Sequence, residues 1–127
     1  MNYRILVVDD EEGIRELYRM QMESAGYEVL TAVDSRGTME ALKNHTVHLV
    51  VLDIRLKGES GLELLQDISR EQSHVPVILS SAYSSFRSDF SSWLAEGYVV
   101  KSSDSHELLD EISKVLEKRY GKGRKKG

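Results

Sequence analysis

Short apolar runs alternate along this chain with longer segments in which apolar residues recur every three or four positions. The runs predict five strands, at residues 3–8, 28–32, 49–53, 77–79 and 98–100. An unbroken apolar run is typical of a strand that is buried on both faces, as in parallel sheets covered by helices. The run Leu49–Asp53 shows this best, because its apolar residues end abruptly in a carboxylate.

The segments between the strands have the spacing of amphipathic helices. We expect helices over about residues 10–25, 35–44, 61–69, 84–96 and 105–119. Asp10 is placed to cap the first of these helices, and Gly26 to end it. Asp104 and Glu107 have the spacing of a capping box at the start of the last helix. The residues expected to face the core are Ile14, Leu17, Tyr18, Met22, Ala25, Met39, Leu42, Leu62, Leu65, Ile68, Leu108, Leu109, Ile112, Val115 and Leu116.

The expected fourth helix has an unusual composition. Its many serines lower its helix propensity. Its aromatic residues Phe86, Phe90 and Trp93 nevertheless recur at helical spacing. These rings form either a stripe that packs on the core or a face on which a partner docks.

Strands that alternate with helices predict an α/β three-layer sandwich with a parallel sheet and right-handed crossovers. A chain of 127 residues is long enough for one domain with a sizeable core and too short for two. The absence of cysteine excludes disulfides, thiolate metal sites and a cysteine nucleophile. Since no signal peptide and no membrane-length apolar stretch are visible, we expect a cytoplasmic protein that makes no membrane contact.

Charge is distributed unevenly along the chain, whose formal net charge is -4. Residues 118–127 hold six basic side chains and no acidic ones. Removing those six from the 17 basic residues leaves 11 against 21 acidic ones, a net charge near -10. Because phosphate contacts need a basic face, we expect no direct nucleic-acid binding by the body of the domain. We expect the basic end to be a solvated tail, with nucleic acid or an acidic partner as the alternative contact.

Polar side chains follow four of the five predicted strands. They are Asp9 and Asp10, then Asp53, then Ser80 and Ser81, and finally Lys101. The carboxyl ends of parallel strands meet at one edge of a sheet, so these side chains should lie close together.

Three carboxylates gathered at one edge would repel one another, and at least one pKa would rise. A hard divalent cation such as Mg²⁺ removes that cost, because it prefers oxygen ligands. An ammonium group and a hydroxyl beside the carboxylates complete a site suited to an incoming phosphoryl group, which needs positioning and charge neutralisation. Asp53 would be the nucleophile and would form an acyl phosphate.

In this order, these motifs closely resemble the receiver domain of bacterial two-component response regulators. The resemblance implies a flavodoxin-like (βα)5 fold with sheet order 2-1-3-4-5, a receiver domain at residues 1–119, and a basic tail or linker start at 120–127. The matching runs are Ile5-Leu6-Val7-Val8-Asp9-Asp10-Glu11, Leu52-Asp53-Ile54-Arg55-Leu56 with Gly58 and Gly61, Val75-Pro76-Val77-Ile78-Leu79-Ser80-Ser81-Ala82, and Tyr98-Val99-Val100-Lys101.

The resemblance also implies a role for each matching residue. Asp53 matches the phosphoacceptor, and Asp10 matches the direct ligand of Mg²⁺, for which Mn²⁺ can substitute. Asp9 would act on the metal largely through water, and Arg55 through its backbone carbonyl.

A second group of positions matches the residues that respond to the phosphoryl group. Ser81 matches the residue whose hydroxyl moves toward the phosphoryl group, and Lys101 matches the lysine whose ammonium contacts that group. Tyr98 matches the aromatic residue whose rotamer couples to that hydroxyl, which shifts a pre-existing equilibrium that partners read. Arg55 and Tyr83 stand at positions that influence acyl-phosphate hydrolysis in this family, so we hypothesise a slowed or partner-controlled loss of phosphate.

The sequence departs from the family pattern at three places. Ser102 replaces the proline that usually follows the active-site lysine, so we expect a trans peptide bond there. Lys57 stands where a second proline is frequent. The segment between Ser81 and Lys101 is about two residues shorter than usual, which predicts a short or irregular fourth helix.

Three functions are compatible with these observations. The first is a receiver that a histidine kinase or phosphotransfer protein phosphorylates. Such a receiver would act on a downstream protein or on a missing effector domain, and it could form a weak or phosphorylation-dependent dimer. The second is a pseudo-receiver that binds proteins without phosphorylation. The third is a phosphatase of the haloacid dehalogenase type, disfavoured because Arg55 stands where that class wants a second aspartate and there is no room for a cap insertion.

Overall fold

The computed structural model describes residues 2–82, 94–101 and 106–121. Five parallel strands form one sheet in the order β2-β1-β3-β6-β7, which is 2-1-3-4-5 when only these strands are counted. The predicted fold class and strand order are therefore confirmed. The strands are β1 (Arg4–Val8), β2 (Glu28–Ala32), β3 (Leu49–Asp53), β6 (Val77–Ser81) and β7 (Gly97–Val100).

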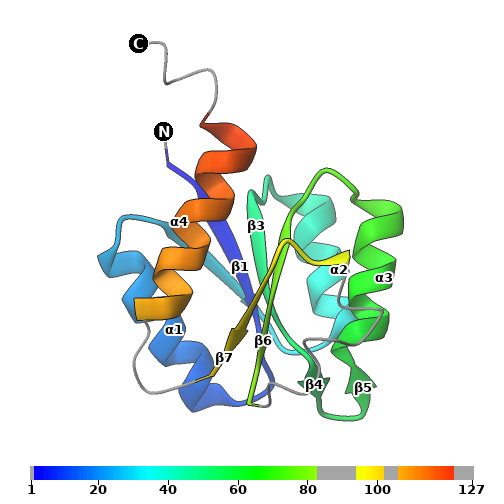
Figure 1. Cartoon of the computed structure of the whole chain (residues 1–127). Helices are drawn as coiled ribbons and strands as arrows, with labels where there is room; N and C mark the ends of the chain where they lie inside the picture. Colours follow the sequence, from blue (N-terminus) through cyan, green and yellow to red (C-terminus); the bar gives the residue numbers. More distant parts are fainter. Residues whose placement is uncertain (1, 83–93, 102–105, 122–127) are drawn as a thin grey trace.

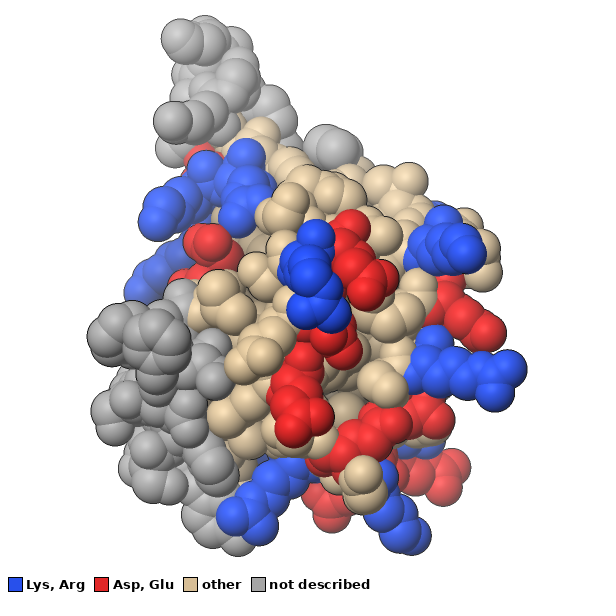
Figure 2. All heavy atoms as spheres, turned by 90° about the vertical axis from the view of Figure 1, so that its right-hand side faces the viewer, with Lys and Arg blue, Asp and Glu red and all other residues tan. Residues whose placement is uncertain are grey.

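Helices cover both faces of the sheet, so the molecule has three layers (Figure 1). On one face lie α1 (Glu12–Ser24) and α4 (His106–Tyr120), and on the other α2 (Ser35–Asn44) and α3 (Gly61–Glu71). Figure 2 shows that, among the described residues, the face formed by α2 and α3 mixes acidic and basic side chains and presents no extended basic surface.

Alternate residues of each strand pack into two separate apolar clusters, one on each side of the sheet. Successive side chains of a strand point to opposite faces, so Val51 belongs to the cluster under α1 and α4, and Leu52 to the cluster under α2 and α3. Every residue of β3 and β6 is buried. The apolar runs in the sequence are continuous because these central strands are covered on both faces.

The ends and inner faces of some helices differ from the prediction. The first helix begins at Glu12 with Glu11 at the N-cap, so the prediction that Asp10 caps it is wrong. Leu17 was expected to face the core but is 37% exposed. In the third helix, which extends to Glu71, Leu64 is buried while Leu62 is only half-buried.

A small hairpin follows β3, where the sequence indicated only a loop with two glycines. Strands β4 (Arg55–Leu56) and β5 (Glu59–Ser60) pair antiparallel across a two-residue connection. Gly58 has a φ of 73° in that connection, a left-handed conformation that glycine adopts without steric cost. This hairpin leads the chain directly from the phosphoacceptor position into α3.

Several predictions fall outside the described residues. They concern Tyr83, residues 84–93 of the helix expected over 84–96, the peptide bond before Ser102, and the capping role of Asp104. Residues 94–96 of that expected helix are described, and they form no α-helix. Within the described part of the chain, no helix combines the length and the apolar character that crossing a bilayer requires.

Candidate phosphoryl and metal site

The carboxyl ends of four strands bring the predicted polar residues to one edge of the sheet. Asp9 directly follows β1, Asp53 ends β3, Ser81 ends β6 and Lys101 directly follows β7. These strands are neighbours and run parallel, so their ends lie together. The structure therefore brings these side chains together at one edge of the sheet, as the sequence predicts.

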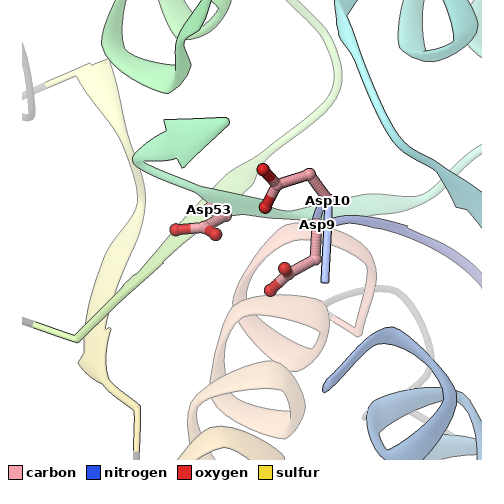
Figure 3. Close-up of side chains that lie close together, drawn as sticks. All are labelled: Asp9, Asp10 and Asp53. Carbon is pink, nitrogen blue, oxygen red and sulfur yellow. The ribbon is translucent and has the colours of Figure 1, made fainter. Parts of the chain in front are cut away.

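Three carboxylates converge at this edge. One oxygen from each of Asp9, Asp10 and Asp53 lies within 4.8 Å of the other two. Figure 3 shows these side chains leaving the ends of β1 and β3 toward a common space. Asp9 is 2% exposed and Asp53 is 7% exposed, whereas Asp10 is half-buried.

Lys101 joins two of these carboxylates. Its Nζ donates to Asp9 Oδ2 over 2.8 Å and to Asp53 Oδ2 over 3.0 Å. Burial raises the pKa of Asp53 above its ordinary value, against the opposing effect of the Lys101 ammonium. Burial works to lower the pKa of Lys101, but its hydrogen bonds to Asp9 and Asp53 outweigh burial and raise that pKa. The ammonium is therefore fixed beside the phosphoacceptor position in its charged form.

Backbone N–H groups orient the other carboxylate oxygens. The amide of Glu11 donates to Asp9 Oδ1 over 3.0 Å, and the amide of Arg55 donates to Asp53 Oδ1 over 3.2 Å. Both donors stand two residues beyond the carboxylate they serve, the pattern of an Asx turn. Each strand end therefore holds its own carboxylate in a defined rotamer.

The start of α3 fixes the backbone of β3 next to Asp53. The amide of Gly61 donates to the carbonyl of Ile54 over 2.6 Å. A Cβ at Gly61 would lie 2.8 Å from both Ile54 Cα and Ile54 O, and closer still to the carbonyl oxygen of Asp53. Only a residue without a Cβ permits this approach. The sequence showed Gly61 only as part of a loop motif and did not reveal the contact.

An open hollow of about 300 Å³ lies over this group of residues. Ser81 and Arg55 line it as expected. Tyr98 does not line it, and packs half-buried against the apolar cluster under α2 and α3. Tyr98 pairs with Leu79, two residues before Ser81, so Tyr98 and Ser81 lie on the same face of the sheet. The residues around the hollow are Asp10, Glu11, Asp53, Arg55, Ser81, Ala82 and Lys101.

The donor set at this edge fits a hard cation. Carboxylate oxygens predominate, and Mg²⁺ commonly binds one or two carboxylates together with water and phosphate oxygens. A cation beside Asp10 and Asp53 would also offset the mutual repulsion of the three carboxylates. The residues present can therefore hold Mg²⁺ and still leave room for an anionic group in the hollow.

The sequence named Ser80 as a polar residue at a strand end, but it did not reveal that Ser80 meets the hydroxyl of Tyr18 behind the hollow. The hydroxyls of Tyr18 in α1 and Ser80 in β6 lie 3.4 Å apart and are buried. Tyr18 occupies an apolar position in the helical pattern, so its periodicity predicts core packing and gives no sign of this contact.

Comparison with known proteins agrees with this site. The response regulator receiver domain family matches residues 5–113. The uncharacterized transcriptional regulatory protein YrkP of Bacillus subtilis is 42% identical over 94% of this chain and 52% of its own length. The chain thus spans about half the length of this curated relative.

Solved structures show the same relationship. The response regulator TrrA of Thermotoga maritima, in complex with Mg(2+)-BeF, is 43% identical with a TM-score of 0.86, over 90% of this chain and 99% of TrrA. TrrA in complex with the histidine kinase ThkA matches with a TM-score of 0.84, at the same identity, over 90% of this chain and 98% of the matched chain. This chain belongs to the response regulator receiver domain family.

Proposed function

We propose that this chain, as a receiver of a two-component system, accepts a phosphoryl group on Asp53 from a phosphohistidine of a histidine kinase or phosphotransfer protein. One observation carries the proposal: the Asp53 carboxylate at a strand end accepts a hydrogen bond from the Lys101 ammonium and lies next to two further carboxylates, Asp9 and Asp10. The ammonium suits a transferring anion and the carboxylates suit a cation, so both requirements of phosphoryl transfer meet at Asp53.

In the proposed reaction, an Asp53 Oδ attacks phosphorus while the bond from phosphorus to the donor nitrogen breaks. The bonding electron pair of that bond returns to the imidazole, and Asp53 becomes an acyl phosphate. Lys101 moves from its paired carboxylates to contact the phosphoryl oxygens, and the Ser81 hydroxyl donates to another. Asp10, Asp53 and the Arg55 carbonyl would hold Mg²⁺, with Asp9 acting through water, and the cation would neutralise charge on the transferring group.

The response to phosphorylation would pass through Ser81 and Tyr98. When the Ser81 hydroxyl follows the phosphoryl group, it vacates space on the sheet face that it shares with Tyr98. Inward movement of Tyr98 would then stabilise one of two pre-existing conformations of the surrounding face, which a downstream protein or effector domain reads.

The wider proposal retains the expectations drawn from the sequence. The domain comprises residues 1–119 together with Tyr120, the last residue of α4, and is followed by a basic tail or linker. It acts in the cytoplasm as a signalling module, not as an enzyme on other substrates, and supports only its own phosphotransfer and slow autodephosphorylation. Any dimer is weak or depends on phosphorylation, and the acidic body does not bind nucleic acid directly.

Intact-mass measurement after incubation with Mg²⁺ and acetyl phosphate tests this function. We expect a mass gain equal to one phosphoryl group that requires Mg²⁺ and disappears in Asp53→Ala. Asp67→Ala is the matched control, because it removes an exposed carboxylate that pairs with Arg70 on α3. A wild-type protein that gains no mass would instead support a pseudo-receiver that binds partners without phosphorylation.

A further inference from the structure

Behind the hollow, a buried polar pair joins the end of β6 to α1. The hydroxyls of Tyr18 and Ser80 lie 3.4 Å apart, and either one can donate. Tyr18 is 3% exposed and Ser80 is 1% exposed. Neither hydroxyl can therefore turn to solvent, and a buried hydroxyl that loses its partner must find another or remain unsatisfied at a cost in stability.

Ser80 faces the same side of the sheet as the phosphoacceptor. Val51 and Ile78 are register partners that belong to the same apolar cluster, under α1 and α4. Side chains two residues further along each strand return to that face. Asp53 and Ser80, which are also register partners, are therefore neighbours there, on strands about 4.8 Å apart.

Tyr18 covers this polar layer from α1. Burial raises the pKa of the Tyr18 phenol, the hydrogen bond with Ser80 opposes this, and the charges of Lys101, Asp9 and Asp53 also act on it. The phenol therefore lies within electrostatic reach of the site, although Tyr18 does not line the hollow.

We propose that Tyr18 is a positioning residue for phosphoryl transfer, which holds the Ser80 hydroxyl and so keeps it away from the Asp53 carboxylate. The proposal rests on the function of Asp53 given above. Ser80 is the donor of the pair with Tyr18 in this proposal. Without the Tyr18 hydroxyl, the Ser80 proton then needs another acceptor in the same buried layer, and the charged acceptor there is the carboxylate of its register partner, Asp53. An extra hydrogen bond stabilises the Asp53 lone pairs and makes the carboxylate a weaker nucleophile.

Initial rates of phosphorylation by acetyl phosphate and Mg²⁺ test this role. We expect Tyr18→Phe to slow the reaction by roughly 2- to 10-fold, the range that one ordinary hydrogen bond corresponds to. Ser80→Ala removes the competing hydroxyl, so the double variant Tyr18→Phe/Ser80→Ala should recover a rate within about twofold of wild type. Tyr120→Phe is the matched control, because its hydroxyl donates to the His48 carbonyl over 2.8 Å at the opposite edge of the sheet.

The rescue separates positioning from packing. If Tyr18 served only the fold, the second substitution would leave the defect in place or enlarge it. Urea denaturation of each variant checks that it is folded under the assay conditions. A wild-type rate in Tyr18→Phe, or a double variant as slow as Tyr18→Phe, overturns the inference while Asp53 phosphorylation stands. A wild-type protein that gains no phosphate removes the proposed function and this inference together.

Discussion

Gly61→Ala is the substitution whose consequence the structure defines most closely. The added Cβ would lie 2.8 Å from Ile54 Cα and Ile54 O, where ordinary contacts begin at 3.4 Å. All the contacted atoms belong to the backbone, so no flexible side chain can turn aside. The end of β3 and the start of α3 must separate by at least about 0.6 Å, and the 2.6 Å hydrogen bond from Gly61 to Ile54 must lengthen with them.

The size of the effect follows from two contributions. Overpacking of this kind costs about 1–3 kcal/mol, and weakening one buried hydrogen bond adds up to about 1 kcal/mol. We therefore expect Gly61→Ala to lower the free energy of unfolding by about 1–4 kcal/mol, out of about 5–15 kcal/mol for a typical domain. In a domain of this size, a loss in the middle of that range corresponds to a fall in Tm of about 10 °C. Because the displaced carbonyl belongs to Asp53, phosphorylation by acetyl phosphate should slow as well.

Urea denaturation measures the change, and Gly13→Ala provides the matched control. A Cβ at Gly13 meets nothing within 4 Å, and Gly13 lies exposed in α1. Replacing a helical glycine by alanine there should stabilise the protein by about 0.5–1 kcal/mol. Opposite signs for the two glycines are the expected result. If Gly61→Ala unfolds at the same urea concentration as wild type, the contact between α3 and β3 is not as tight as described.

Two further predictions concern the site itself. The pKa of Asp53 is raised in the folded protein, so ionising Asp53 lowers the free energy of unfolding. This loss of stability is absent below the ordinary value of 3.8, grows as pH rises above that value, and is complete above the folded pKa. Asp53→Asn should therefore gain stability relative to wild type in urea denaturation without Mg²⁺ as pH rises above 3.8, and a difference that shrinks with rising pH would contradict the shift. Arg55→Ala should change the rate at which the phosphorylated protein loses phosphate, measured by the decay of the added mass, because an arginine there can reach the phosphoryl group. Lys57→Ala, in the same hairpin, should leave this rate of phosphate loss unchanged. An unchanged rate in Arg55→Ala would refute the hypothesis of slowed hydrolysis.

Much of the fold can be read from the sequence because burial on both faces leaves a local signature. Strand β3, which is buried at every residue, has the bounds that its apolar run predicts. The order of polar residues at the strand ends also gave Asp9, Asp10, Asp53, Ser81 and Lys101 as a group, since parallel strands place equivalent ends at one edge. These inferences need only the period of a strand and the direction of the chain.

Other features depend on contacts between segments far apart in the chain, which no local pattern encodes. Asp10 has the composition of a helix cap, but in the tertiary structure the helix starts at Glu12 and Asp10 lines the hollow instead. The hairpin at Arg55–Ser60 is too short for its pairing to show as a periodic pattern.

In the site, too, some features follow from the sequence and others only from tertiary contacts. From the sequence alone, Asp53 is a carboxylate at the end of a buried strand, with a lysine expected nearby. Only the packed structure shows Lys101 shared between Asp9 and Asp53, Gly61 pressed against the backbone of β3, and Tyr18 holding Ser80 behind the hollow. Residue type and period determine which groups reach the edge of the sheet. How their hydrogen bonds are divided is decided by distances of a few tenths of an ångström, which only the packing of helices on the sheet sets.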